Sequence, residues 1–124
     1  MSSFCIKQVS SGVKFDLVDD RGIIIVKSEV YISEGSCLKG IESVRRNSIK
    51  AHFEDCTDES CGSMPNPKFM LYTDKKGEFR FRLKARNGEI IAVSDGYERK
   101  SECVAAIELV RRLAPDAAAV HIDD

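Results

Sequence analysis

Residues 79–88 read FRFRLKARNG, in which apolar and basic side chains alternate strictly up to an Asn-Gly pair. Successive side chains of a β-strand point to opposite faces, so the pattern predicts a strand with its four apolar side chains on a buried face. Asn-Gly is typical of a tight β-hairpin turn and predicts that the chain returns as a second strand over residues 89–94. We therefore expect a sheet with one buried face.

This plan occurs twice in the chain. A shift of 66 positions places residues 4–51 on residues 70–117 without a gap, and 14 of the 48 pairs are identical. Phe15 falls on Phe81 and Tyr31 falls on Tyr97. Self-similarity at a fixed spacing indicates a repeat architecture, so we interpret the chain as a tandem duplication.

Each copy is predicted to be a β-β-β-α-β unit. In the second copy the periodicity favours a helix over residues 100–113, ended by Pro115, and a closing strand over residues 117–122. In the first copy the helix begins at a plausible N-cap, Ser33, and the closing strand covers residues 51–54.

The domain boundaries follow from the repeat. Residues 1–55 form the first copy, residues 56–67 a polar linker ending in two prolines, and residues 68–124 the second copy. One copy of about 55 residues is near the lower limit for a self-sufficient core. We therefore expect a single α+β domain with one antiparallel sheet, both helices on one face, and a pseudo-two-fold axis between the copies.

Composition limits the class of protein. The chain has 124 residues, with 19 Lys and Arg against 20 Asp and Glu and a net charge of -1, which argues against a protein that coats nucleic acid non-specifically. The odd count of five cysteines and the short apolar runs favour a cytoplasmic protein without a membrane segment. A fused pseudo-dimer of this kind is expected to be a monomer.

The segment from Lys75 to Ile91 resembles the YegP-like family of small bacterial proteins, whose hallmark is Gly-Glu-Phe-Arg-Phe-x-Leu-x-Ala-x-Asn-Gly. The helix core Gly40-Ile41-Glu42-Ser43-Val44 also matches that family. The resemblance implies β-β-β-α-β units that share one sheet and exchange their C-terminal strands. It implies no activity, cofactor or catalytic residues, because the family has none established.

A basic stripe is the main candidate site. Arg80, Arg82, Lys84 and Arg86 occupy every second position, and a two-residue hairpin would place Ile91 and Val93 opposite them on the outer face. One interpretation is a solvated face on which long basic stems cover aliphatic neighbours. The other is a binding face for an acidic protein surface or for single-stranded nucleic acid. The first copy departs from the stripe, with Asp16, Val18 and Asp20 at the equivalent positions.

Catalytic and metal-binding patterns are weak. Cys37 and Cys103 occupy equivalent apolar helix positions and are expected to be buried small hydrophobes. Cys56 and Cys61 in the linker have no second ligand pair of the kind that zinc requires, and whether they are redox-active stays open. The sequence therefore predicts a non-enzymatic binding or accessory module without a cofactor that uses the outer sheet face, with binding of single-stranded nucleic acid by the second copy as the alternative.

Overall fold

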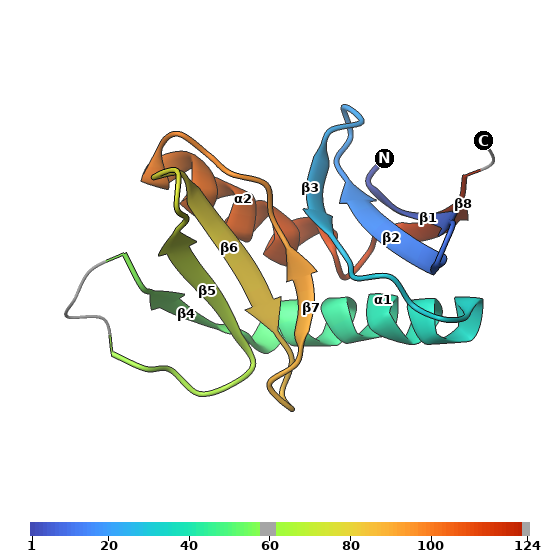
Figure 1. Cartoon of the computed structure of the whole chain (residues 1–124), viewed down its shortest axis with the longest axis horizontal. Helices are drawn as coiled ribbons and strands as arrows, with labels where there is room; N and C mark the ends of the chain where they lie inside the picture. Colours follow the sequence, from blue (N-terminus) through green and yellow to red (C-terminus); the bar gives the residue numbers. More distant parts are fainter. Residues whose placement is uncertain (58–61, 123–124) are drawn as a thin grey trace.

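The protein, seen here as a computed structural model, is described over residues 1–57 and 62–122. The first repeat contains β1 (Ser3–Val9), β2 (Gly12–Val18), β3 (Ile24–Lys27), α1 (Glu34–Lys50) and β4 (His52–Asp55). The second contains β5 (Lys68–Thr73), β6 (Phe79–Lys84), β7 (Ile90–Val93), α2 (Lys100–Leu113) and β8 (Ala118–His121) (Figure 1). The predicted β-β-β-α-β unit is present in both.

One eight-stranded sheet joins the repeats in the order β4-β5-β6-β7-β3-β2-β1-β8. The closing strand of the first repeat, β4, pairs with β5 of the second, and β8 pairs with β1 of the first. The halves also meet at the centre, where Lys27 of β3 lies opposite Val93 of β7. The expected exchange of C-terminal strands is therefore confirmed.

The expectation of a purely antiparallel sheet is wrong at both edges. β4 runs parallel to β5 and β8 runs parallel to β1, whereas the pairs between them are antiparallel. Hairpins force antiparallel pairing on the strands that they connect. Each closing strand is reached through a helix, so its direction is fixed by the strand that receives it in the other repeat.

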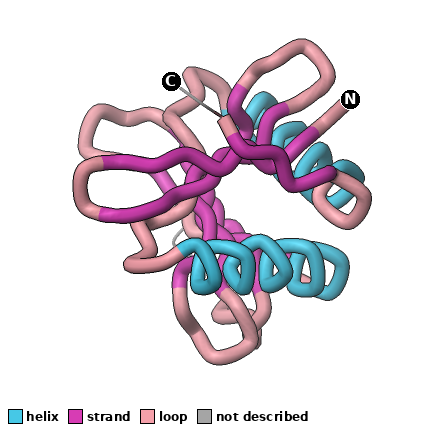
Figure 2. The backbone as a smooth tube through the Cα atoms, turned by 90° about the vertical axis from the view of Figure 1, so that its right-hand side faces the viewer, coloured by secondary structure: helices cyan, strands magenta, loops and turns pink. Residues whose placement is uncertain are grey.

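A single core lies between the sheet and the two helices. Phe4, Phe15, Phe69 and Phe81 are fully buried, and in each repeat two of these rings meet edge to face, at centroid distances of 5.6 Å and 5.9 Å. The helices add equivalent sets to the same cluster, namely Cys37, Ile41 and Val44 from α1 and Cys103, Ile107 and Val110 from α2. Because both helices pack against β5 and β6 through this cluster, they lie on one face of the sheet, as predicted (Figure 2).

A side-chain cap marks the start of α1. The Ser33 side chain accepts a hydrogen bond from the Ser36 N–H at 3.1 Å, which confirms the predicted N-cap. Neither helix among the described residues is long and apolar enough to cross a bilayer.

The turn between β6 and β7 is longer than the two-residue hairpin that Asn-Gly predicted. The Ala85 N–H donates to the Glu89 carbonyl at 2.8 Å, so three residues lie between the last paired positions. Within this turn only Gly88 has a positive φ, of 87°, whereas the two-residue type I′ turn needs positive φ at both central residues. A type I turn that ends in a left-handed glycine therefore replaces the predicted turn, and it introduces a register shift between Leu83 and Lys84.

The exchange predicts a long-range effect of truncation. Deleting residues 117–124 removes β8 and leaves β1 as an exposed edge, so amide exchange should accelerate in the first repeat and most strongly in β1. Hydrogen-exchange NMR on the truncated and intact chains measures this. Unchanged protection across residues 4–48 would contradict the exchange.

Candidate functional site

The basic stripe lies on the face of the sheet that points away from the helices. Phe81 and Leu83 of β6 point into the core, and the alternate residues Arg80, Arg82 and Lys84 are half-buried on the outer face. Arg86 does not belong to this row. It follows the end of β6 in the turn and lines a hollow beside α1 instead.

The register shift also changes the apolar partners of the stripe. Lys84 pairs with Ile90, which is 40% exposed, whereas Ile91 is 7% exposed and belongs to the core. The placement of Ile91 on the outer face is therefore wrong, because the additional turn residue brings Ile90 opposite Lys84 and the irregularity next to Leu83 restores the predicted register only after Ile91. Val93 keeps its predicted place opposite Arg82.

A row of directly paired residues crosses the outer face. The row contains Val120, Cys5, Asp16, Lys27, Val93, Arg82, Met70 and Glu54. In the first repeat, the negative charge of Asp16 is neutralised by neighbouring side chains. The Lys14 and Lys7 ammonium groups lie 2.8 Å and 3.4 Å from its carboxylate. The first copy thus has a cluster of one aspartate and two lysines around Asp16, the position that is equivalent to Arg82 in the second copy.

Arg80 has a carboxylate partner at one end of the stripe. Its Nε donates to Asp74 Oδ2 at 2.7 Å. This hydrogen bond from Arg80, with those from the Lys76 and Glu78 N–H groups, holds the pKa of Asp74 below its usual range. Asp74 therefore stays ionised and offsets the charge of Arg80.

Arg82 has no carboxylate partner among the described residues. Its guanidinium lies over the Tyr72 ring, with Cζ 4.2 Å from the ring centroid. Its Nε is buried and has no hydrogen-bond partner among the residues that the structure describes. Loss of water without a replacement partner costs about 1–3 kcal/mol, so this position carries charge that the fold does not satisfy. The sequence interpretation missed Tyr72, although its outward position on β5 could have indicated the stack.

Glu54 and Lys68 form a buried ion pair at the β4 edge. Lys68 Nζ donates to Glu54 Oε1 at 2.9 Å, and the Met64 N–H donates to the same oxygen at 2.7 Å. Burial opposes ionisation of Glu54, but donation from Met64, Lys68 and the Cys56 thiol outweighs it and lowers the pKa of Glu54 to about 2. The end of the linker is thereby fixed against the outer face, and Lys68 is not available to a ligand.

The cysteines lie in different environments. Cys37 and Cys103 are fully buried as expected, and burial raises the pKa of Cys103 to about 11 and that of Cys37 above its usual value. The Cys56 thiol donates to Glu54 Oε2 at 3.2 Å. The partner that the sequence offered for it, Cys61, lies outside the described residues.

The fold defines a class: a tandem-repeat α+β protein in which two units share one sheet and exchange their edge strands. Residues 10–55 and 74–120 match the domain of unknown function DUF1508, so the chain belongs to this family and contains two copies of the domain. The resemblance to YegP-like proteins is thereby confirmed.

Relatives and solved structures agree with this assignment. A UPF0339 protein of Pseudomonas aeruginosa is 32% identical over 117 residues, covering 94% of this chain and 93% of the relative. A UPF0339 protein of Treponema denticola is 58% identical over 55 residues, covering 44% of this chain and 95% of that protein, so it is similar to a single repeat.

The solution structure of YegP from Escherichia coli, a protein of unknown function, superposes with a TM-score of 0.79 at 27% identity. The match covers 97% of this chain and 91% of YegP. A UPF0339 protein of Shewanella oneidensis has the same fold, with a TM-score of 0.78 at 24% identity, covering 97% of this chain and 90% of the other.

The buried Glu54 carboxylate predicts a pH dependence of stability. Its pKa is lower in the folded than in the unfolded chain, so the stability that its ionised form contributes is present above about pH 4.5 and is lost as the pH falls toward 2. Glu54→Gln should lower the free energy of unfolding at pH 7 by about 3 kcal/mol, because Lys68 loses its counter-ion, and should remove part of the pH dependence.

Denaturant titrations between pH 7 and pH 2 measure both effects. Glu98→Gln, at an exposed position, is the matched control and should behave like the native chain. Equal pH dependence in the native chain and Glu54→Gln would refute this role of Glu54.

Proposed function

We propose that the chain is a non-enzymatic binding module that docks an acidic protein surface on the outer face of β5, β6 and β7. The observation that carries the proposal is Arg82, a half-buried cation that lies on Tyr72 and whose Nε has no partner among the described residues. Lys84, on the same side of the strand, forms no ion pair within the described part of the chain. Carboxylates of a partner would supply the missing negative charge.

The neighbours of Arg82 favour a protein partner. Met70 and Val93 lie directly opposite it on either side, and Val93 and Ile90 are exposed. Arginine and tyrosine surrounded by apolar side chains are the composition typical of the energetically dominant centre of a protein–protein interface.

Single-stranded nucleic acid is the alternative, and the same residues make it the weaker one. Stacking of bases needs accessible aromatic faces. On the outer face of β5–β7, within the described residues, Tyr72 is the single aromatic side chain, and its ring lies beneath the Arg82 guanidinium.

The absence of catalysis is part of the proposal. The two helix thiols are buried and protonated at neutral pH, because their pKa values are raised, and a thiol is a poor nucleophile compared with a thiolate. The two histidines, His52 and His121, are exposed, and neither forms a hydrogen bond with a helix thiol within the described residues.

A competition between two polyanions tests the proposal. Fluorescence anisotropy at about 50 mM salt compares a labelled poly-glutamate peptide with a single-stranded oligonucleotide of equal charge. We expect the intact chain to bind the peptide, and Arg82→Gln/Lys84→Gln to weaken that binding at least about tenfold, since the two cations of this strand that lack carboxylate partners are lost.

Lys75→Gln/Lys76→Gln is the matched control. It removes the same charge from exposed positions in the turn between β5 and β6, and it should change peptide affinity by less than about threefold. Binding of the oligonucleotide but not the peptide would establish the alternative. Absence of binding to either probe, or equal loss in both double variants, would refute a binding role of the stripe.

A further inference from the structure

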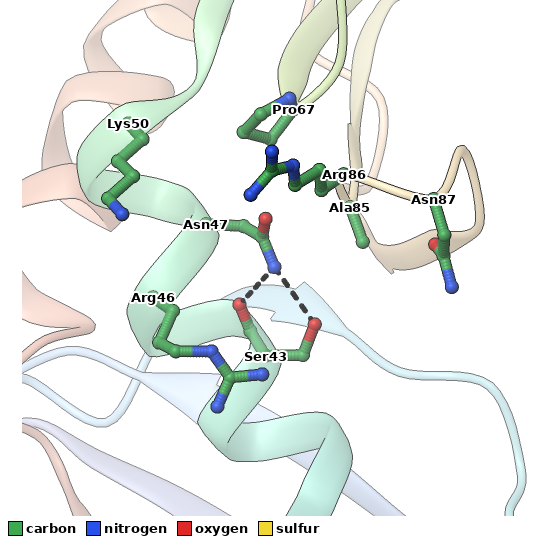
Figure 3. Close-up of a pocket in the computed structure, with 8 residues that line it drawn as sticks. All are labelled: Ser43, Arg46, Asn47, Lys50, Pro67, Ala85, Arg86 and Asn87. Carbon is green, nitrogen blue, oxygen red and sulfur yellow. Dashed lines mark hydrogen bonds between the residues drawn. The ribbon is translucent and has the colours of Figure 1, made fainter.

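A second basic site lies between α1 and the turn that connects β6 and β7, away from the stripe. A hollow of about 320 Å³ is lined by Ser43, Arg46, Asn47 and Lys50 of α1 and by Arg86 and Asn87 of the β6–β7 turn (Figure 3). We refer to it as the α1–turn pocket. Because α1 belongs to the first repeat and the turn to the second, the pocket exists only in the joined molecule.

The charge of the α1–turn pocket is uniformly positive. Arg46, Lys50 and Arg86 line it, and no carboxylate does. None of the three cations forms an ion pair with any residue in the described ranges, whereas the neighbouring Arg45 is paired with Glu42. Three like charges around one hollow repel one another, and an anion between them would remove that repulsion.

The polar lining adds a directed donor. Asn47 Nδ2 donates to the Ser43 carbonyl at 2.8 Å and to Ser43 Oγ at 3.0 Å, which uses the hydroxyl as an acceptor. The hydroxyl proton of Ser43 is therefore left to donate elsewhere. Figure 3 shows the Arg86 side chain extending from the turn toward α1, and both asparagine–serine hydrogen bonds on the helix surface beneath it.

The second repeat offers an internal comparison. At the equivalent place Leu109, Arg112 and Leu113 of α2 face Asp19, Asp20 and Arg21 across a hollow of about 250 Å³. The fold thus makes this hollow twice, but Asp20 stands where the first pocket has Arg86, and Asp116 stands at the repeat position of Lys50. Packing does not require Lys50 or Arg86, because aspartates stand at their repeat positions, whereas Arg112 keeps the position of Arg46.

We propose that the α1–turn pocket binds a phosphate group, either as inorganic phosphate or as the monoester of a small molecule. Two guanidinium groups match a tetrahedral oxyanion because each can donate two parallel hydrogen bonds, and the lysine and serine supply further donors. A volume of about 320 Å³ is at the small end of ligand sites and admits a phosphate with a short organic group. This site is separate from the outer face and does not depend on the function proposed for it.

An NMR titration tests the proposal. Inorganic phosphate and glycerol phosphate are added in parallel to labelled protein at constant ionic strength, with sodium acetate as the carboxylate control. We expect saturable shifts of the amides of residues 43–50 and 85–88 with phosphate and little change with acetate. Tighter binding of glycerol phosphate than of inorganic phosphate would assign the monoester, and equal or weaker binding would assign the free ion.

Arg86→Asp, which copies the other hollow, should weaken phosphate binding about ten- to hundredfold. Arg112→Gln is the matched control, since it removes an exposed arginine from the equivalent hollow, and should leave the affinity unchanged. Absence of saturation, or the same affinity in Arg86→Asp as in the intact chain, would overturn the proposal. Shifts confined to residues 79–84 would overturn it as well, since they would place the anion on the outer face.

Discussion

Exchange of the closing strands is the constraint on which the rest of the structure depends. A unit of this length is near the lower limit for an independent core, and without the exchange each unit would leave an edge of its sheet open. Pairing of β4 with β5 and of β8 with β1 covers both edges and carries α1 and α2 across the boundary between repeats. The core, the row across the outer face and the α1–turn pocket are all products of that arrangement.

The parts of the fold that the sequence predicts are those set by local pattern. Alternation over residues 79–85 identified Phe81 and Leu83 as core residues, and the helix stripes identified Cys37 and Cys103. Ser33 was recognisable as an N-cap because a hydroxyl in that position satisfies a free N–H of the first turn. The shared sheet was predictable from the repeat, because two similar units that are each near the lower size limit for a core gain stability by packing together.

What the sequence did not predict depends on tertiary context. The direction of β4 and β8 is set by a receiving strand more than a dozen residues away along the chain, so local pattern cannot reveal that these pairs are parallel. The positions of Ile91 and Arg86 depended on the turn type, because the longer turn takes up Arg86 and shifts the pairing of the residues next to it as far as Ile91. Asn-Gly is compatible with both turns, and pairing across the sheet decides between them.

The two repeats have kept one fold and have diverged in charge. Asp16 is held by two lysines in the first repeat, whereas its counterpart Arg82 has no carboxylate partner among the described residues. The same contrast separates Asp20 from Arg86 in the two hollows beside the helices. Each half therefore serves as a reference for the other, and the positive charges of Arg82 and Arg86 are features that the fold alone does not need.

A single cross-linking measurement tests the exchange most directly. Cys5 of β1 lies opposite Val120 of β8, and directly paired residues of neighbouring strands are close enough for a disulfide. Mild oxidation of Val120→Cys should join the introduced thiol to Cys5 within one molecule, as peptide mapping by mass spectrometry would show, and Cys5→Ser in the same background should abolish the link. A cross-link only between molecules, or none while the fold is intact, would contradict the account.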